Sequence, residues 1–547
     1  MKITLLSINS KYIHSSLALW YLTAACEGIG KVTPLEHSIN EPSSKILQSV
    51  YESHPDFLCI CCYIWNIDIA LRLCREIKLL LPNLKIVLGG PEVSFRGEEI
   101  LKDASEIDAV ILGEGEVSLP AFLRGDLPNG VIYRDGDRII KQGDYQCIED
   151  LDSLPSPYTP QMMESLRGKL AYFESSRGCP FSCAYCLSSA TKGVRTFSME
   201  RVKSDLLKLV SSDVQTIKFV DRTFNCDKNR AKEIVRFLLS IEQDTTFHFE
   251  VGADLFDDEL LTLLKSAPVG KFQIEAGIQS TNEETLASVC RKTDTAKALD
   301  AISEIVSWGN IHVHADLICG LPHEGLESFE RSFNDLFATR PHALQVGFLK
   351  LLHGSALRDN FGGKFSPFAP YQVLETDSLS ADDLFFLQNF ENSVELFYNS
   401  GRFTCTVNYL VTVFTSPFRL FAHLAEKVST KPSFSPDNLF ALLSALDKDG
   451  IDRKRLYASL AFDYLCSFKS RHLPEFLQEP RDAFHLIENG KIAAFSHIPV
   501  KVLLKTIAVK EFPFDMQSPA LPAIPRTYIF SRKDRCKITG RFKFFVA

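Results

Sequence analysis

The segment LAYFESSRGCPFSCAYCLSS, residues 170–189, holds a short apolar strand pattern and, directly after it, three cysteines within eight positions. No nearby cysteine or histidine joins Cys179, Cys183 and Cys186 to complete the four ligands that a structural zinc site normally needs. Three thiolates on one loop suit a cubane iron–sulfur cluster, in which the fourth iron is left open for a cofactor or substrate. The spacing therefore predicts a 4Fe–4S cluster on these cysteines, with core or redox thiols as the alternative interpretation.

Five further strand patterns follow the cysteine loop and alternate with helical patterns. They read TIKFV, FHFEVGA, KFQIEAGI, HVHADLICG and ALQVGFLK. Six successive βα units predict a partial (β/α)6 barrel, and barrel enzymes carry their chemistry in the loops that follow the strands. The cysteine loop follows the first strand, so it occupies a position expected for a functional site.

The N-terminal part also alternates short apolar runs with helical patterns. Its candidate strands are KITLLSI, VTPLEHS, FLCICCYI, KIVLGG and DAVILG. This alternation predicts a doubly wound parallel sheet, which binds ligands at the carboxyl ends of its strands. Two of those ends are rich in glycine, in Gly89-Gly90-Pro91-Glu92 and in Gly113-Glu114-Gly115-Glu116. Glycine there permits close approach of a ligand to the backbone, and a purely steric role in the turn is the alternative.

The remaining sequence divides into a connector and a mainly helical region. Turn-forming and proline-rich segments mark the connector, while Ser380 and Ser435 have the pattern of helix caps. The basic end SRKDRCKITGRFKFF is interpreted as a solvated tail or an edge strand rather than a nucleic-acid arm. We expect a fold of the α/β class with the following parts: a doubly wound domain over 1–125, a linker over 126–168, a barrel over 169–370 and a mostly helical domain over 371–547.

Composition excludes several classes of protein. Hydrophobic residues make up 45% of the chain and charged residues 23%, which is typical of a soluble globular protein. The net charge of −8 gives no general reason to expect nucleic acid, and no stretch is long and apolar enough to cross a bilayer. The N-terminal segment predicts a first strand rather than an export signal. We therefore expect a cytoplasmic protein whose other cysteines are mostly free thiols.

With an aromatic residue before the last cysteine, the CxxxCxxC motif resembles the signature of the radical S-adenosylmethionine superfamily. The segments FVDRTFN, IEAGIQS, DLICGLPHE and GFLKLLHGS resemble the subgroup that carries an N-terminal cobalamin-binding domain. The C-terminal region resembles an uncharacterised helical domain found in one branch of this subgroup. The resemblance implies an enzyme in which S-adenosylmethionine chelates the open iron, and in which one-electron reduction cleaves its carbon–sulfur bond to give a 5′-deoxyadenosyl radical.

The resemblance also implies roles for individual residues of the barrel. The backbone around Tyr185 would contact adenine, and the rest of this cofactor pocket would be formed by Asp221, Arg222, Glu275, Gln279 and Ser280. Glu275 is explained equally well as a barrel-interior carboxylate in an ion pair. Asp316 and Lys350, at the ends of later strands, are candidate catalytic acid–base or substrate-binding groups, with structural roles as the alternative. Cys319 is interpreted as a buried thiol rather than a hydrogen donor.

The first domain resembles a cobalamin-binding domain in its segments VLGGPEVSF and ILGEGE. This resemblance implies that the cofactor's nucleotide tail enters the sheet near Gly89, Gly90, Ser94, Gly113 and Glu114. Many such domains carry an Asp-x-His-x-x-Gly motif whose histidine binds cobalt. Here Tyr12 stands in place of the aspartate and Leu17 in place of the glycine. We therefore expect cobalamin without a histidine ligand and His14 as a loop residue that contacts cofactor or backbone, with ligation by His14 as the alternative.

The leading functional hypothesis is cobalamin-dependent methyl transfer to an unactivated carbon or phosphorus centre. The protein would aim both cofactors at one substrate atom and exclude water. The alternatives are a radical rearrangement or cyclisation without methyl transfer, and a non-catalytic iron–sulfur redox protein. The expected partners are a small-molecule or peptide substrate and a one-electron donor such as flavodoxin or ferredoxin, whereas neither a membrane nor nucleic acid is expected.

Overall fold

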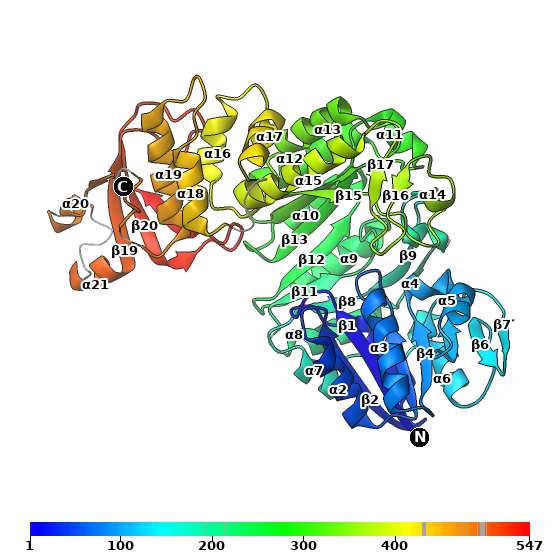
Figure 1. The fold of residues 1–547 in the computed structure, drawn as a ribbon. Helices are drawn as coiled ribbons and strands as arrows, with labels where there is room; N and C mark the ends of the chain where they lie inside the picture. Colours follow the sequence, from blue (N-terminus) through cyan, green and yellow to red (C-terminus); the bar gives the residue numbers. More distant parts are fainter. Residues whose placement is uncertain are drawn as a thin grey trace.

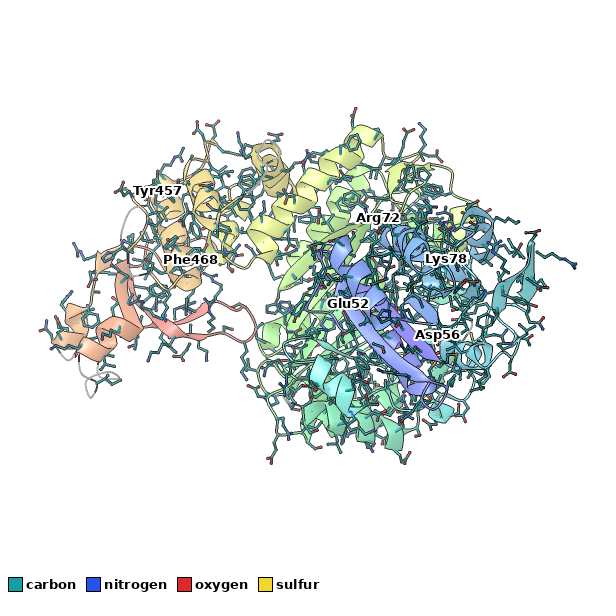
Figure 2. The ribbon with its side chains drawn as sticks, turned by 60° about the horizontal axis from the view of Figure 1, so that its bottom comes forward. Glu52, Asp56, Arg72, Lys78, Tyr457 and Phe468 are labelled. Atoms are coloured by element: carbon teal, nitrogen blue, oxygen red, sulfur yellow. The ribbon has the colours of Figure 1, made fainter. Side chains whose placement is uncertain are left out.

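Three large sheets follow one another along the chain and are joined by helices (Figure 1). The computed structural model describes all residues except 192, 213, 429–433, 471, 478–479, 490, 493–497 and 499. In Figure 1 the first sheet lies beside the second, and the third projects from the far end of the helical region. Figure 2 shows the same separation, with Glu52 and Arg72 at one end of the molecule and Tyr457 and Phe468 at the other.

The first sheet has the strand order β2-β1-β3-β4-β5-β6-β7, in which the first five strands are parallel. Its strands are β1 Lys2–Asn9, β2 Lys31–Ser38, β3 Phe57–Cys61, β4 Lys85–Gly89, β5 Ala109–Ile111, β6 Val131–Asp135 and β7 Arg138–Gln142. The helices are α1 Leu17–Ala25, α2 Ser43–Ser53, α3 Ile67–Leu80, α4 Pro91–Ser94, α5 Gly97–Asp103 and α6 Gly115–Leu123. Two apolar clusters cover the two faces of this sheet, and strands buried on both faces read as continuous apolar runs.

The segment expected to be a linker contributes two strands to this sheet. β6 and β7 form an antiparallel hairpin on β5, and the turn between them contains Gly136 at a φ of 59°. The Asp135-Gly136 pair is a strong hairpin signal, because glycine adopts the left-handed conformation that a tight turn needs. Polar character of the segment therefore marked a surface hairpin as well as a connection.

The second sheet contains six parallel strands in the order β15-β14-β13-β12-β11-β8. They are β8 Ala171–Phe173, β11 Thr216–Phe219, β12 Thr246–Val251, β13 Phe272–Gln279, β14 His312–Cys319 and β15 Ala343–Phe348. The helices between them are α8 Met199–Val210, α9 Lys228–Leu239, α10 Asp258–Lys265, α11 Glu283–Ser288, α12 Thr295–Trp308 and α13 Leu326–Ala338. β8 and β15 lie at the two edges, so the described strands form the partial barrel that the sequence predicts.

The C-terminal region is helical and ends in a small antiparallel sheet. Its main helices are α15 Ala381–Val394, α16 Thr404–Val411, α17 Pro417–Val428, α18 Pro436–Ser444 and α19 Arg453–Ser467. Ser380 caps α15 through a capping box with Asp383, and Ser435 caps α18, as predicted. The sheet has the order β18-β19-β20-β21, with β18 Arg481–Asp482, β19 Ile507–Phe512, β20 Arg526–Arg535 and β21 Phe542–Val546. The basic chain end is thus an edge strand.

The third sheet touches the barrel again through the turn between β20 and β21. Lys537 Nζ lies 2.6 Å from Asp244 Oδ1, in the loop that precedes β12. Within the described part of the chain, no helix has the length and apolar character needed to cross a membrane. The predicted architecture of a doubly wound domain, a partial barrel and a mainly helical C-terminal region is confirmed.

Candidate functional site

The three predicted cluster ligands lie on one loop at the carboxyl end of β8. The loop begins with β9 Ser176–Cys179, which pairs antiparallel with β10 Gly193–Thr196. Gly178 has a φ of +96°, and a Cβ there would lie 2.2 Å from the Gly193 carbonyl oxygen, so no other residue fits. All three cysteines are free thiols, Cys183 being buried and the other two half-buried. Their donor set fits a cluster held by three thiolates.

Arg291, which the sequence did not single out, contacts this loop. Its Nη1 lies 3.8 Å from Cys183 Sγ and 3.4 Å from Tyr185 Oη, and its Nη2 donates to the Gly277 carbonyl oxygen. Burial raises the pKa of the Cys183 thiol, and the Arg291 guanidinium opposes that rise by favouring the thiolate. A cation beside a ligating sulfur also stabilises a metal-bound thiolate.

The end of β13 carries an irregular backbone next to Arg291. The pairing with β14 shifts between Gly277 and Gln279, and Gln279 has a φ of 72°. A Cβ at Gly277 would lie 2.1 Å from Gln279 Nε2, so the amide side chain folds over a position open only to glycine. Strained backbone of this kind is concentrated at functional sites. This bulge sets the direction of the Gln279 side chain.

Two predicted cofactor residues, Asp221 and Ser280, have partners within the protein. Asp221 is 2% exposed and accepts hydrogen bonds from the Ser175 backbone and from the hydroxyls of Ser175 and Ser176. Ser280 is fully buried and donates to Glu324 Oε1 at 2.6 Å. Both side chains thereby fix loops around the cluster, and their contact with a cofactor stays a prediction.

Glu275 lies inside the barrel in the ion pair that the sequence left open as one alternative. Its Oε2 accepts from Lys218 Nζ at 2.9 Å and from His248 Nε2 at 3.0 Å. Burial alone would raise its pKa, but these two hydrogen bonds lower the pKa of Glu275 to about 2. Asp316, also inside the barrel, has its pKa raised well above the ordinary value by burial and by Glu275. Lys350 is exposed beyond β15 and does not line the cavity described next.

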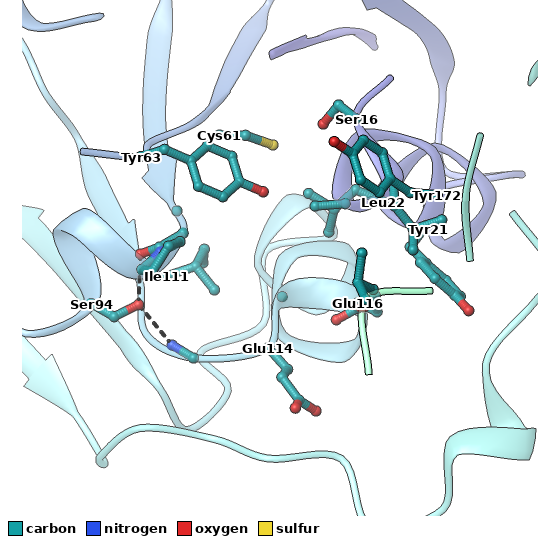
Figure 3. A pocket seen from close by; sticks show the side chains of 18 of the residues that line it. Ser16, Tyr21, Leu22, Cys61, Tyr63, Ser94, Ile111, Glu114, Glu116 and Tyr172 are labelled. Atoms are coloured by element: carbon teal, nitrogen blue, oxygen red, sulfur yellow. Dashed lines mark hydrogen bonds between the residues drawn. The ribbon is translucent and has the colours of Figure 1, made fainter. Parts of the chain in front are cut away.

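A cavity of about 650 Å³ separates the carboxyl ends of the first sheet from the barrel (Figure 3). It is lined by all of the residues predicted to hold cobalamin, namely His14, Gly89, Gly90, Ser94, Gly113 and Glu114. The Ser94 hydroxyl donates to the Gly90 carbonyl oxygen at 2.9 Å and accepts from Gly113 N at 3.1 Å, which ties the two glycine loops together. The volume lies in the range of about 300–1,000 Å³ that is typical of ligand pockets.

Glycine is required at both of these loops. Gly90 has a φ of +108°, and a Cβ there would lie 2.5 Å from the Cys62 carbonyl oxygen. Gly113 has a φ of +80°, and a Cβ there would lie 2.3 Å from the Gln146 carbonyl oxygen. The glycines therefore serve the backbone directly, and by doing so they leave a wall without side chains for a flat ligand.

Aromatic rings that the sequence did not single out form another part of the wall. Tyr63 and Trp65 stack with ring centroids 4.5 Å apart and planes inclined by 4°. Flat aromatic faces suit contact with a macrocycle. Across the cavity, His14 Nδ1 lies 2.5 Å from Tyr172 Oη of β8, so His14 links the first domain to the barrel. Cobalt ligation by His14 stays an alternative.

A buried ion network joins the cavity to the cluster loop. Arg177, two residues before Cys179, has its guanidinium 2.6 Å from Glu116 and 2.7 Å from Glu174. Arg195 of β10 holds Glu114 at 2.6 Å. Both arginines lie on the cluster hairpin, whereas Glu114 and Glu116 follow β5 of the first domain. The network therefore fixes the cofactor cavity relative to the cluster loop.

Three family models match successive parts of the chain. The B12 binding domain matches residues 3–123, the Radical SAM superfamily residues 173–336, and the protein of unknown function DUF4080 residues 359–526. The chain belongs to the radical S-adenosylmethionine superfamily, in the group that combines a B12-binding domain with the radical domain. The predicted cofactors, a 4Fe–4S cluster, S-adenosylmethionine and cobalamin, are those that these two domains take.

Named relatives agree with this assignment. The cobalamin-dependent radical SAM methyltransferase TokK of Streptomyces tokunonensis is 24% identical, over 74% of this chain and 66% of its own. The 2-(S-pantetheinyl)-carbapenam-3-carboxylate methyltransferase of Streptantibioticus cattleyicolor is 26% identical, over 53% of this chain and 46% of its own. The chain thus spans about half to two thirds of the length of these relatives.

Solved structures show the same fold. The cobalamin-dependent S-adenosylmethionine radical enzyme OxsB, with aqua-cobalamin and S-adenosylmethionine bound, has a TM-score of 0.58 at 15% identity, covering 84% of this chain and 78% of that chain. The methyltransferase TsrM from Kitasatospora setae has a TM-score of 0.57 at 16% identity, covering 66% of this chain and 77% of that chain. At these identities the likeness concerns the arrangement of domains.

Proposed function

We propose that this protein is a cobalamin-dependent radical S-adenosylmethionine methyltransferase that acts on an unactivated carbon or phosphorus centre. One observation carries the proposal. A single cavity is lined on one side by the glycine loops of the B12-binding domain and on the other by barrel residues, among them Tyr172, Lys218 and Arg222. A substrate between these walls would face both cofactor sites at once, which is what a transfer between them requires.

The residues divide the work between the two sites. Cys179, Cys183 and Cys186 would hold the cluster, and the glycine loops would take the cobalamin. When bound, cobalamin supplies a transferable methyl group, and the cluster with S-adenosylmethionine supplies the radical that activates the acceptor. Arg177 fixes the two sites relative to each other through its contacts with Glu116 and Glu174. Pre-set geometry of this kind is the protein's main contribution when cofactors carry the chemistry.

The reaction has two products that are measurable without knowing the acceptor. S-adenosylhomocysteine reports removal of the methyl group, and 5′-deoxyadenosine reports reductive cleavage. We expect the reduced, cobalamin-loaded protein to form both from S-adenosylmethionine in an anaerobic assay followed by mass spectrometry. Cys183→Ala should lose 5′-deoxyadenosine, whereas Cys536→Ala, a cysteine of the C-terminal sheet, should keep both products. Formation of neither product by the loaded protein would refute the proposal.

A second candidate is a radical rearrangement or cyclisation without methyl transfer. It is favoured by likeness to the anaerobic magnesium-protoporphyrin IX monomethyl ester cyclase of Cereibacter sphaeroides, 23% identical over 54% of this chain and 52% of its own. Formation of 5′-deoxyadenosine without S-adenosylhomocysteine would favour this candidate. The proposal includes a cytoplasmic location, where a one-electron donor such as flavodoxin or ferredoxin would reduce the cluster.

A further inference from the structure

The interior of the barrel is polar and partly open to solvent. Along β12, β13 and β14 fully buried side chains alternate with half-buried ones, and the half-buried positions are mostly polar. We define the lumen cluster as the titratable residues at such positions that lie close together: Lys218, His248, Glu250, Glu275, His314 and Asp316. Barrel interiors are normally filled by packed side chains. Half-buried polar residues at this place therefore leave room for a ligand.

The lumen cluster carries more acid than base. Lys218 Nζ is shared between Glu275 at 2.9 Å and Glu250 at 3.4 Å, which leaves Asp316 as a third carboxyl group without a cation. Burial lowers the pKa of His314, so this imidazole is neutral at neutral pH and accepts rather than adds positive charge. Burial, with the negative charges of Glu275 and Glu250, raises the pKa of Asp316, which shows that this position lacks positive charge.

Asp316 also has an acceptor atom without a donor. Its Oδ1 is buried and receives no hydrogen bond from the described residues, since His314 Nε2 lies 3.1 Å away without hydrogen-bond geometry. Ligand atoms of Glu275, His314 and Asp316 lie within 4.8 Å of one another, so they point at one spot. A buried acceptor left unpaired costs about 1–3 kcal/mol, and a ligand that donates there recovers that free energy.

The lumen cluster is continuous with the cavity of Figure 3. Lys218 and Glu250 line that cavity as well as the barrel interior. A metal ion would suit the spot poorly, because Glu275 Oε2 already accepts from Lys218 and His248, and because the Lys218 ammonium would repel the ion. A compact organic cation with several N–H donors suits three converging acceptors.

We infer that the lumen cluster binds the methyl acceptor through a protonated primary amine of that substrate. The inference rests on the proposed function in one respect, which is that it identifies the ligand as the acceptor. The ammonium group would donate to Asp316 Oδ1 and to His314, and the carbon skeleton would extend toward the cavity and its glycine loops. The acceptor is therefore an amine-bearing molecule rather than a carboxylate or a neutral polyol.

Isothermal titration of the cobalamin- and cluster-loaded full chain tests this inference, with 1,4-diaminobutane, succinate and 1,4-butanediol as probes of matched length. We expect the diamine to bind at least tenfold more tightly than either other probe. Asp316→Asn should weaken that binding roughly tenfold or more, because a hydrogen bond to a charged group is lost. Asp300→Asn, on the exposed face of α12, is the matched control and should leave it unchanged.

Three results would overturn the inference. They are an absence of diamine binding, tighter binding of succinate, and diamine binding that Asp316→Asn leaves unchanged. Competition is the fourth arm: displacement of the diamine by S-adenosylmethionine would assign the spot to that cofactor and overturn the acceptor assignment, whereas simultaneous binding supports it. Cobalamin content and 5′-deoxyadenosine formation, measured on the same preparation, report separately on the proposed function.

Discussion

Replacing Arg177 with glutamine removes the cation that joins the cluster hairpin to the first domain. The side chains of Arg177, Glu116 and Glu174 are 12%, 9% and 10% exposed, so solvent screens this network little. Breaking a buried ion pair by removing one partner costs about 3–5 kcal/mol, because the other charge stays buried and uncompensated. We therefore expect Arg177→Gln to lower the free energy of unfolding by about that amount in urea titrations of the anaerobic protein.

The pH dependence of that loss follows from Glu174. Burial raises the pKa of Glu174 and Arg177 opposes the rise, so the variant should raise this pKa further. A carboxyl group with a raised pKa in the folded state is stabilising when protonated and becomes destabilising as the pH increases. The loss should accordingly be larger at pH 8 than at pH 5.

Two variants sharpen the test. Arg72→Gln breaks a pair in which Arg72 is 58% exposed, and it should cost less than about 1 kcal/mol. Arg177→Gln combined with Glu116→Gln should cost less than the sum of the single variants, because the orphaned charge is removed. The reasoning is refuted if Arg177→Gln costs no more than Arg72→Gln at either pH.

Gly90→Ala should abolish cobalamin retention after gel filtration, because the new Cβ would lie 2.5 Å from the Cys62 carbonyl oxygen; normal cobalamin content would contradict this. Arg291→Met should shift the reduction potential of the cluster to a more negative value in an EPR-monitored titration, since a cation beside Cys183 favours the reduced, more negative state. Arg291→Lys should restore part of the shift, and equal potentials in all three proteins would refute the role. Glu275 has a pKa depressed to about 2, so its contribution to stability is present at neutral pH and lost as the pH falls below about 4.3. The destabilisation by Glu275→Gln should therefore be smaller at pH 4 than at pH 7, and a pH-independent loss would count against the ion pair.

Local patterns predicted most of the fold. Every predicted strand of the first domain and of the barrel is present, because each combines a short apolar run with flanking turn or helix signals. The glycine loops were also found from sequence, since only glycine permits the backbone at Gly90 and Gly113. The three cysteines needed nothing beyond their spacing.

The parts that were missed depend on contacts between distant segments. Arg291 approaches Cys183 across 108 positions of sequence, and nothing in SVCRKTD distinguishes it from a surface arginine. The four-stranded C-terminal sheet pairs short strands whose register no local pattern specifies. The polar alternation in FHFEV and HVHADLIC was readable, and it indicates a polar barrel interior rather than a packed one.

The central claim is that one protein holds cobalamin and the cluster around a shared cavity. The direct test is to produce the protein with added cobalamin, purify it without oxygen, and quantify cobalamin and iron beside the visible spectrum. The account predicts near-stoichiometric cobalamin together with about four irons per chain. Iron without cobalamin, even after reconstitution, would contradict it and would leave a radical enzyme whose first domain serves another ligand.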